Sequence, residues 1–443
     1  MNFNLIQHPP SPFSFFWNPA SSRERYEELL MADTPFDATP YHGQHVLTWR
    51  KGTDFWAARD PFGVAKLFYT LPDKKGTFHL GHSLCELMAQ SGAGFEKIFS
   101  IPAGHAARFD LAQGRVFLKP YYTLPQSPDS STAFDMEGFG RKIRSRLDDC
   151  LGRLLPRLGA SEIHVTLSGG LDSTMIAALL KHHADKAGLS VTAFTFSVQG
   201  HDGENEVSED MIFARKAARD LKIPLREVAI TRQNLIEGVD DALRHGMDWR
   251  DFNHHCALAN LYLARAIREY RDSKKLPGPG FVFTGELMNE LTADYTTVEF
   301  DGADYYVVPK LGKGRLRRLY LQGMDSASRE TGVFRASNLE AMEPYFAVAE
   351  DYLQVPEDIL IESNAKQQIS AMVGGDLVPG YIFDRKKVRE QVGSEKSGGV
   401  LKTLIRAGIT QDFLKRRFSG IFRIPPSLAV ESVFQLGRFR RQP

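Results

Sequence analysis

The pattern of hydrophobic and polar positions changes near residue 130 of the chain. Before it, short runs of aromatic and branched residues are separated by turn signals rich in Gly, Pro, Asp and Lys. Runs of this kind are typical of β-strands. They stand at 45–49, 54–60, 66–71, 77–82, 105–111 and 114–122. The first part of the chain is therefore expected to be β-rich.

The polar stretch 126–133 is rich in Ser and Pro and is the best candidate for a linker. We place a boundary at about residue 130, which predicts one domain over 1–130 and another over 131–443. An amphipathic helix is expected directly after the boundary, because apolar residues recur there every three or four positions. These residues are Phe139, Ile143, Leu147, Leu151 and Leu154.

Strand and helix patterns alternate through the second part of the chain. Buried-strand patterns stand at 163–167, 191–198, 225–230 and 280–285, and helical patterns at 172–188, around 207–221 and around 254–271. Alternation of this kind predicts an α/β fold, with a parallel sheet and crossover helices.

Composition excludes several classes of protein. The 443 residues carry 55 Lys and Arg against 54 Asp and Glu, so no basic excess points to nucleic acid or a membrane surface as partner. The cysteines Cys85, Cys150 and Cys256 are too far apart for a disulfide framework or a structural zinc site. The sequence has no apolar run of about 18 residues, as a membrane span needs, and residues 1–17 lack a signal-peptide pattern. A cytoplasmic location is expected.

The chemistry centres on the sequence Leu-Ser-Gly-Gly-Leu-Asp-Ser-Thr at 167–174, between a strand and a helix. Glycines let backbone N–H groups approach phosphate oxygens, and the helix N-terminus adds partial positive charge. Ser168, Ser173 and Thr174 supply hydroxyls, and Asp172 can hold a magnesium ion that bridges phosphates. The loop matches neither GxxxxGK[ST] nor GxGxxG, so P-loop and dinucleotide readings fit poorly.

This loop resembles the pyrophosphate-binding motif of the ATP pyrophosphatases, and other stretches resemble the asparagine synthetase and β-lactam synthetase group. The stretches are 194–198 (adenine strand), 284–290 (S/T-G-E-G-S-D-E), 339–346 (V-E-A-R-V-P-F-L) and 385–387 (R-x-K). The resemblance implies an adenine nucleotide α-hydrolase-like synthetase domain. It also implies ATP contacts at Leu167, Ser168, Gly169, Gly170, Leu171, Asp172, Ser173, Val198, Thr284 and Gly285.

The same resemblance implies the catalytic and metal-binding residues. Glu340 would act as acid and base, Lys387 would stabilise developing negative charge, and Glu286 would be a third catalytic group. Asp172 and Asn289 would hold Mg²⁺. Asn289 stands where the family usually has Asp, and an amide is a weaker magnesium ligand. Either Glu286 or Glu290 replaces the missing Asp as a magnesium ligand, or the metal geometry differs from that of the family.

The first domain resembles the second half of the family's Ntn glutaminase domain. Residues 59–69 resemble R-D-x-x-G-x-x-P-L-Y-Y, and residues 101–105 resemble a strand that carries P-A-G-S. A working glutaminase needs an N-terminal Cys whose own amine acts as base. Here Asn2 follows Met1, and no cysteine precedes Cys85. We therefore expect the first domain to be a truncated remnant without glutaminase activity. The amine that acts as nucleophile is then not expected to be ammonia released from glutamine.

The resemblance implies a ligase that uses ATP and Mg²⁺ to adenylate a carboxylate and pass the acyl group to an amine, releasing AMP and pyrophosphate. The expected substrates are small-molecule or peptide carboxylates and amines, joined as a lactam or an intermolecular amide, in antibiotic or other specialised-metabolite biosynthesis. The alternatives are a lasso-peptide-type macrolactam cyclase, an ammonia-dependent asparagine synthetase, and a non-catalytic nucleotide-binding paralogue, which Asn289 favours. Residues from 250–260 and 286–306 are expected to set specificity, and the oligomeric state stays open.

Overall fold

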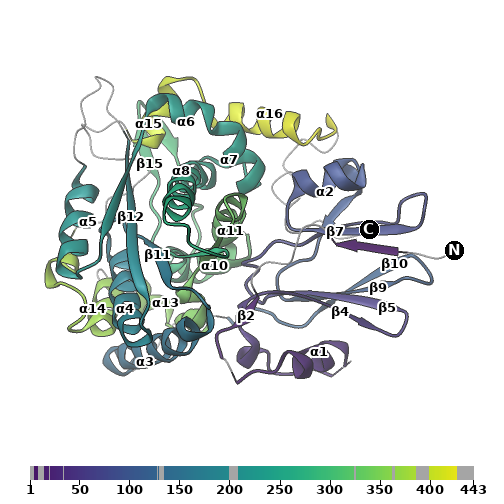
Figure 1. Ribbon diagram of the computed structural model, residues 1–443, viewed down its shortest axis with the longest axis horizontal. Coiled ribbons are helices and arrows are strands. Elements are labelled where there is room, and N and C mark those ends of the chain that lie inside the picture. Colours follow the sequence, from purple (N-terminus) through teal and green to yellow (C-terminus); the bar gives the residue numbers. More distant parts are fainter. Residues whose placement is uncertain are drawn as a thin grey trace.

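The computed structural model describes residues 4–7, 14–18, 20–32, 34–126, 128, 134–198, 208–323, 326–361, 365–385 and 399–426. The chain forms two units, a front unit of stacked sheets and a larger unit built around a parallel sheet (Figure 1). None of the helices in these ranges is both long enough and apolar enough to cross a lipid bilayer.

The front unit is a sandwich of two four-stranded sheets with a helix on each outer face (Figure 1). One sheet has the order β1 (Asn4–Gln7), β7 (Thr77–Gly81), β6 (Phe68–Thr70), β8 (Ile98–Ser100). The other has the order β10 (Arg115–Pro120), β9 (His105–Asp110), β5 (Asp54–Arg59), β4 (Val46–Lys51). Buried side chains such as Phe55, Tyr69 and Phe109 fill the space between the sheets. Helix α1 (Arg23–Met31) covers the second sheet, and α2 (Leu84–Ser91) lies on the first.

The Arg-Asp pair at 59–60 holds the turn that follows β5. The Asp60 carboxylate accepts hydrogen bonds from the backbone N–H groups of Val64 (3.0 Å) and Ala65 (3.2 Å). The Arg59 guanidinium donates to the carbonyls of Ala65 and Ile101 at 2.6 and 3.1 Å. Both side chains are almost fully buried. The motif that resembles the glutaminase domain thus has a structural role here.

The larger unit contains a five-stranded, all-parallel sheet, as the alternating pattern predicts. Its order is β13 (Leu225–Ile230), β12 (Ser190–Val198), β11 (Glu162–Thr166), β14 (Gly280–Phe283), β17 (Leu339–Met342). Apolar side chains of α3 (Met136–Leu154), α4 (Leu171–Ala187) and α5 (Glu209–Asp220) pack on one face. Those of α8 (Asp251–Ser273) and α11 (Ser326–Ala336) pack on the other. The α/β fold class is confirmed.

The remaining helices and strands surround this core. They are β2 (Phe15–Phe16), β3 (Gly43–Gln44), α6 (Arg232–Glu237), α7 (Val239–Gly246), α9 (Met288–Thr292), β15 (Val298–Phe300), β16 (Ala303–Tyr305), α10 (Lys313–Arg318), α12 (Ala349–Leu353), α13 (Glu357–Ile361), α14 (Ala365–Gly374), α15 (Val400–Arg406) and α16 (Gln411–Ile421).

Buried polar contacts join the two units. Gln44 donates from Nε2 to the carbonyl of Ala341 (3.0 Å) and accepts from the backbone N–H of Glu343 (2.9 Å), so one amide satisfies two backbone groups beside β17. Thr331 donates to the carbonyl of Val64 at 3.1 Å. The expected linker at 126–133 lies outside the described residues except for 126 and 128. The division at residue 130 therefore stays a prediction.

Candidate active site

A cleft of about 200 Å³ opens at the carboxyl ends of the parallel strands, the usual ligand site of α/β folds. Its lining includes the loop after β11, the first turn of α4, and residues 194–196 of β12. The loop after β14 and one side of α8 complete the wall together with α14. The cleft therefore collects the motif at 167–174 and the motif at 284–290.

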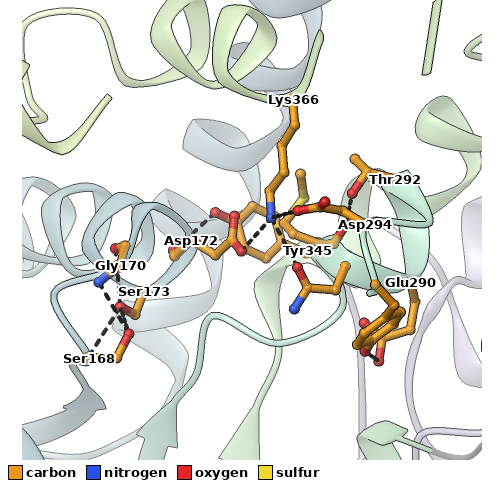
Figure 2. A network of polar contacts seen from close by, with 12 residues as sticks. Ser168, Gly170, Asp172, Ser173, Glu290, Thr292, Asp294, Tyr345 and Lys366 are labelled. Carbon is orange, nitrogen blue, oxygen red and sulfur yellow. Dashed lines mark hydrogen bonds and ion pairs between the residues drawn. The ribbon is translucent and has the colours of Figure 1, made fainter. Parts of the chain in front are cut away.

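The Ser-Gly-Gly loop is shaped by its own hydroxyl groups (Figure 2). The hydroxyls of Ser168 and Ser173 lie 2.9 Å apart, and Ser173 Oγ also accepts from the backbone N–H of Ser168 at 3.2 Å. The backbone N–H of Gly170 donates to Ser168 Oγ at 3.2 Å. Helix α4 begins directly afterwards and runs for 17 residues, so its positive dipole end faces the cleft. An anionic group is the ligand that this arrangement favours.

Two glycines allow the surrounding segments to meet. Gly169 has a φ of +73°, and a Cβ there would lie 2.4 Å from the backbone nitrogen of Ala214 on α5. A Cβ on Gly285 would lie 2.6 Å from the backbone nitrogen of Ser173. The loops after β11 and β14 are thus packed directly against helix backbones, and a side chain at either glycine would force them apart.

Lys366, on α14, reaches into the centre of the site (Figure 2). Its ammonium lies 2.7 Å from Asp172 Oδ2, 3.1 Å from Asn289 Oδ1 and 3.7 Å from Asp294 Oδ2. Tyr345 donates its hydroxyl to the Asp172 carbonyl at 3.1 Å, and burial raises the pKa of that tyrosine well above its usual range. The sequence motifs did not identify Lys366. One available signal was that it is the only charged residue of α14.

The predicted metal ligands Asp172 and Asn289 are brought together, but Lys366 holds one oxygen of each. The other carboxylate oxygen, Asp172 Oδ1, is buried without a hydrogen-bond partner. The described residues contain no group of three or more His, Cys, Asp or Glu suited to a metal ion. Mg²⁺ is often held by one or two carboxylates plus substrate phosphates. Asp172 Oδ1 fits that mode, while a metal role for Asn289 stays a prediction.

The two glutamates of the loop after β14 point in different directions. Glu286 lines the cleft. Glu290 is almost fully buried and accepts a hydrogen bond from the Tyr295 hydroxyl at 2.7 Å, away from Asp172 (Figure 2). Of the two possible replacements for the missing Asp, Glu286 is therefore the one that faces the cleft.

Arg385, the first residue of the R-x-K motif, lines the cleft beside α5. Its guanidinium forms an ion pair with Asp210 and lies 4.5 Å from the ring centroid of Phe213. Burial raises the pKa of Asp210, and the Arg385 charge opposes that rise. Lys387, predicted to stabilise developing charge, lies outside the described residues.

Three other predicted site residues lie apart from the cleft lining. Glu340 pairs with Phe281 within β17, before the strand end, and accepts a hydrogen bond from Arg335 at 3.2 Å. Val198 packs in an apolar cluster, while its neighbours Phe194 and Phe196 line the cleft. Thr284 is buried, and its backbone N–H donates to the Met342 carbonyl at 3.0 Å. The roles given to these three residues stay predictions.

One side of the cleft lining comes from the regions expected to set specificity. From α8, Phe252, Cys256 and Asn260 line it at intervals of four residues, which places them on one face of the helix. Asn260 donates to Glu330 at 2.6 Å, and this glutamate is only 1% exposed. Tyr306 also lines this side. Glu330 was not among the predicted residues, because it lies in no motif.

Comparisons with known proteins agree with this geometry. Residues 142–304 match the family model described as asparagine synthase. Asparagine synthetase [glutamine-hydrolyzing] from Gallus gallus is 25% identical over 358 residues, covering 74% of this chain and 59% of that protein. The Homo sapiens protein of the same name is 26% identical over 355 residues, with the same coverage. The residues that match the family model contain the Ser-Gly-Gly loop and the loop after β14.

The chain resembles asparagine synthetases at this level of identity. It spans about three fifths of the length of the curated relatives that it matches. Among solved structures, NMN synthetase from Francisella tularensis is 15% identical, with a TM-score of 0.31, over 70% of this chain and 99% of that one. The NH3-dependent NAD synthetase from Campylobacter jejuni is 18% identical, with a TM-score of 0.25, over 43% and 77%.

Proposed function

We propose that the protein is an ATP-dependent ligase that adenylates a carboxylate and transfers the acyl group to an amine. The observation that carries the proposal is the Ser-Gly-Gly loop at the N-terminus of α4, with Lys366 and Asp172 facing the same cleft. An anion-binding helix end and an ammonium that lies beside its first turn suit the phosphates of ATP.

The proposed reaction has two steps. A carboxylate oxygen attacks the α-phosphorus, the bond to the bridging oxygen breaks, and pyrophosphate leaves. The amine lone pair then attacks the acyl carbon, the bond to AMP breaks, and the nitrogen gives up a proton. Bound Mg²⁺ would neutralise phosphate charge, with Asp172 Oδ1 as its protein ligand. The helix end and Lys366 supply fixed positive charge where pyrophosphate departs.

A substrate amine, and not ammonia released from glutamine, is the proposed nucleophile. Burial raises the pKa of the Cys85 thiol to about 11 and that of Cys150 well above its usual range. Cys256 lies in the cleft of the larger unit, far from a glutaminase position. Thiols that stay protonated at neutral pH are poor nucleophiles. A lactam, a macrolactam or an intermolecular amide in specialised metabolism all remain products of this proposed chemistry.

Pyrophosphate release with ATP and Mg²⁺, measured over a panel of carboxylates and amines, tests the proposal. Asp172→Ala is expected to abolish release. The matched control is Asp185→Ala, near the other end of α4, where Asp185 pairs only with Lys181 on the surface. Turnover that persists in Asp172→Ala would overturn the assignment.

A non-catalytic nucleotide-binding protein is the second candidate. Asn289 in place of the family's Asp, with its oxygen bonded to Lys366, is the observation that favours it. Calorimetry with ATP and Mg²⁺ separates the two functions, because tight binding without pyrophosphate release from any substrate pair identifies the second.

A further inference from the structure

A second chamber of about 550 Å³ adjoins the cleft. Phe252, Tyr295 and Tyr306 line both cavities, so they form the shared wall. Volumes between roughly 300 and 1,000 Å³ suit small-molecule ligands. A molecule in the chamber would lie directly beside whatever the cleft binds.

The chamber wall is mainly aromatic and apolar. The ring centroids of Tyr295 and Tyr320 are 4.8 Å apart, and those of Phe252 and Tyr295 are 6.0 Å apart. The hairpin of β15 and β16 and the loop that follows it supply much of the remainder. The apolar and aromatic lining residues are Phe252, Tyr295, Tyr305, Tyr306, Val307, Val308, Pro309, Leu319 and Tyr320. Such a wall favours a ligand with a flat ring.

The charges in the described lining are mostly negative. Asp251, Asp304 and Asp412 contribute carboxylates. The guanidinium of Arg250 is held by Asp248, with Nε 2.9 Å from both carboxylate oxygens, so its charge is balanced outside the chamber lining. Tyrosine faces add further attraction for a cation. A carboxylate ligand would be repelled here, whereas it would be attracted to Lys366 in the cleft.

We propose that this chamber binds the amine substrate as an aromatic primary ammonium ion. The inference rests on the proposed ligase function and assigns its two substrates to opposite sides of the shared wall. The aromatic ring packs against the tyrosines, and the ammonium lies toward the carboxylates. The acyl donor and ATP occupy the cleft. The ammonium first gives one proton to a lining carboxylate such as Asp251, and the neutral amine then attacks the acyl carbon beside Phe252, Tyr295 and Tyr306.

Calorimetry on the full chain with three probes tests the charge and the ring separately. The probes are 2-phenylethylamine, hexylamine and 3-phenylpropanoate. We expect 2-phenylethylamine to bind roughly 2- to 13-fold more tightly than hexylamine, because ring contacts with aromatic walls stabilise binding beyond the burial of apolar area. We expect no measurable binding of 3-phenylpropanoate in the chamber.

Two variants locate the binding, each with a matched control. Tyr305→Ala is expected to weaken 2-phenylethylamine binding roughly tenfold, since it removes an aromatic wall. Its control, Phe117→Ala, removes an exposed ring from the front unit. Asp304→Asn is expected to weaken binding about two- to fivefold, as for an exposed ion pair. Its control is Asp301→Asn in the same hairpin, where φ is +51° and Asn is tolerated.

The outcomes are separable from those of the proposed function. Binding of 3-phenylpropanoate that equals or exceeds that of 2-phenylethylamine and that Tyr305→Ala weakens overturns the inference, and so does 2-phenylethylamine binding that neither variant changes. If Tyr305→Ala does not fold by circular dichroism, Asp304→Asn and the three probes still decide. If wild-type protein releases no pyrophosphate from any substrate pair, the ligase proposal fails, whereas the binding results stand on their own.

Discussion

Replacing Lys366 with methionine removes one charge from the centre of the site while keeping most of the side-chain volume. The ammonium is 2.7 Å from Asp172 Oδ2 and 3.7 Å from Asp294 Oδ2, and the lysine side chain is 10% exposed. Without it, the carboxylates of Asp172 and Asp294 lose the positive charge that lies near both of them. Hydrogen bonds to charged groups contribute about 1.5–3 kcal/mol net, so we expect the free energy of unfolding to fall by about 2 kcal/mol.

The same substitution should weaken nucleotide binding. Triphosphate oxygens would draw the ammonium away from the carboxylates, and Lys366→Met has no charge to offer. A loss of about 1.5–3 kcal/mol corresponds to roughly 10- to 100-fold weaker ATP binding. Calorimetry with ATP and Mg²⁺ measures this directly, and urea unfolding measures the stability change.

Lys181→Met is the matched control for this experiment. Lys181 lies on α4, as Asp172 does, but its ion pair with Asp185 is on the surface, with side chains 26% and 59% exposed. Surface pairs contribute about 0–1 kcal/mol, so this variant should bind ATP as the wild type does. ATP affinity in Lys366→Met within threefold of wild type would refute the idea that the ammonium serves the phosphates.

Three further predictions concern stability, each measured by urea unfolding. Gly169→Ala should destabilise the chain by about 2–3 kcal/mol, because its φ is positive and a Cβ there would contact α5. Gly159→Ala is the control and should cost only about 1 kcal/mol, since Gly159 has a φ of +62° but open space around it. Equal losses in the two variants would contradict the packing role of Gly169. Burial lowers the pKa of His45 to about 3, so the unfolded chain takes up a proton below pH 6.5 that the folded chain does not, and stability falls as the pH drops from 6.5 toward 3. His45→Phe should remove about 2 kcal/mol of the loss between pH 7 and pH 5, and an unchanged pH dependence would show that folding does not lower the pKa of this imidazole. Gln44→Leu should lower stability by about 1–3 kcal/mol, since two buried backbone groups lose their partner, and an effect under 0.5 kcal/mol would contradict this reading of the contact.

The sequence predicted the parallel sheet well because its strands are dense in branched and aromatic residues. The pattern at 163–167 became β11, the pattern at 225–230 became β13, and the amphipathic spacing from Phe139 to Leu154 became α3. β17 was recognised only as a motif, whereas β14, which also has four residues, was predicted from its aromatic and branched run. Local pattern therefore identified four of the five strands of this sheet and missed β17.

The candidate site could be predicted only where its residues are neighbours in the sequence. The Ser-Gly-Gly loop is contiguous, and its function depends on neighbouring backbone groups. Lys366 and Asp172 are 194 residues apart in the sequence, and the residues of α14 around Lys366 do not indicate which group its ammonium contacts. Glu340 belongs to a motif, but parallel pairing with Phe281 places it before the strand end and beside Arg335. The pairing register of the strands decides where such a residue lies, and a sequence motif does not specify that register.

The contact of Gln44 with β17 also protects an exposed edge of the parallel sheet. β17 is the last strand in the order of its sheet, and an edge strand offers unpaired N–H and C=O groups to any other chain. One glutamine amide covers the carbonyl of Ala341 and the N–H of Glu343. The front unit thus acts as a cover against strand addition. If the larger unit were produced alone, the edge of β17 would be exposed to pairing with other chains. We expect that unit to self-associate before it loses activity.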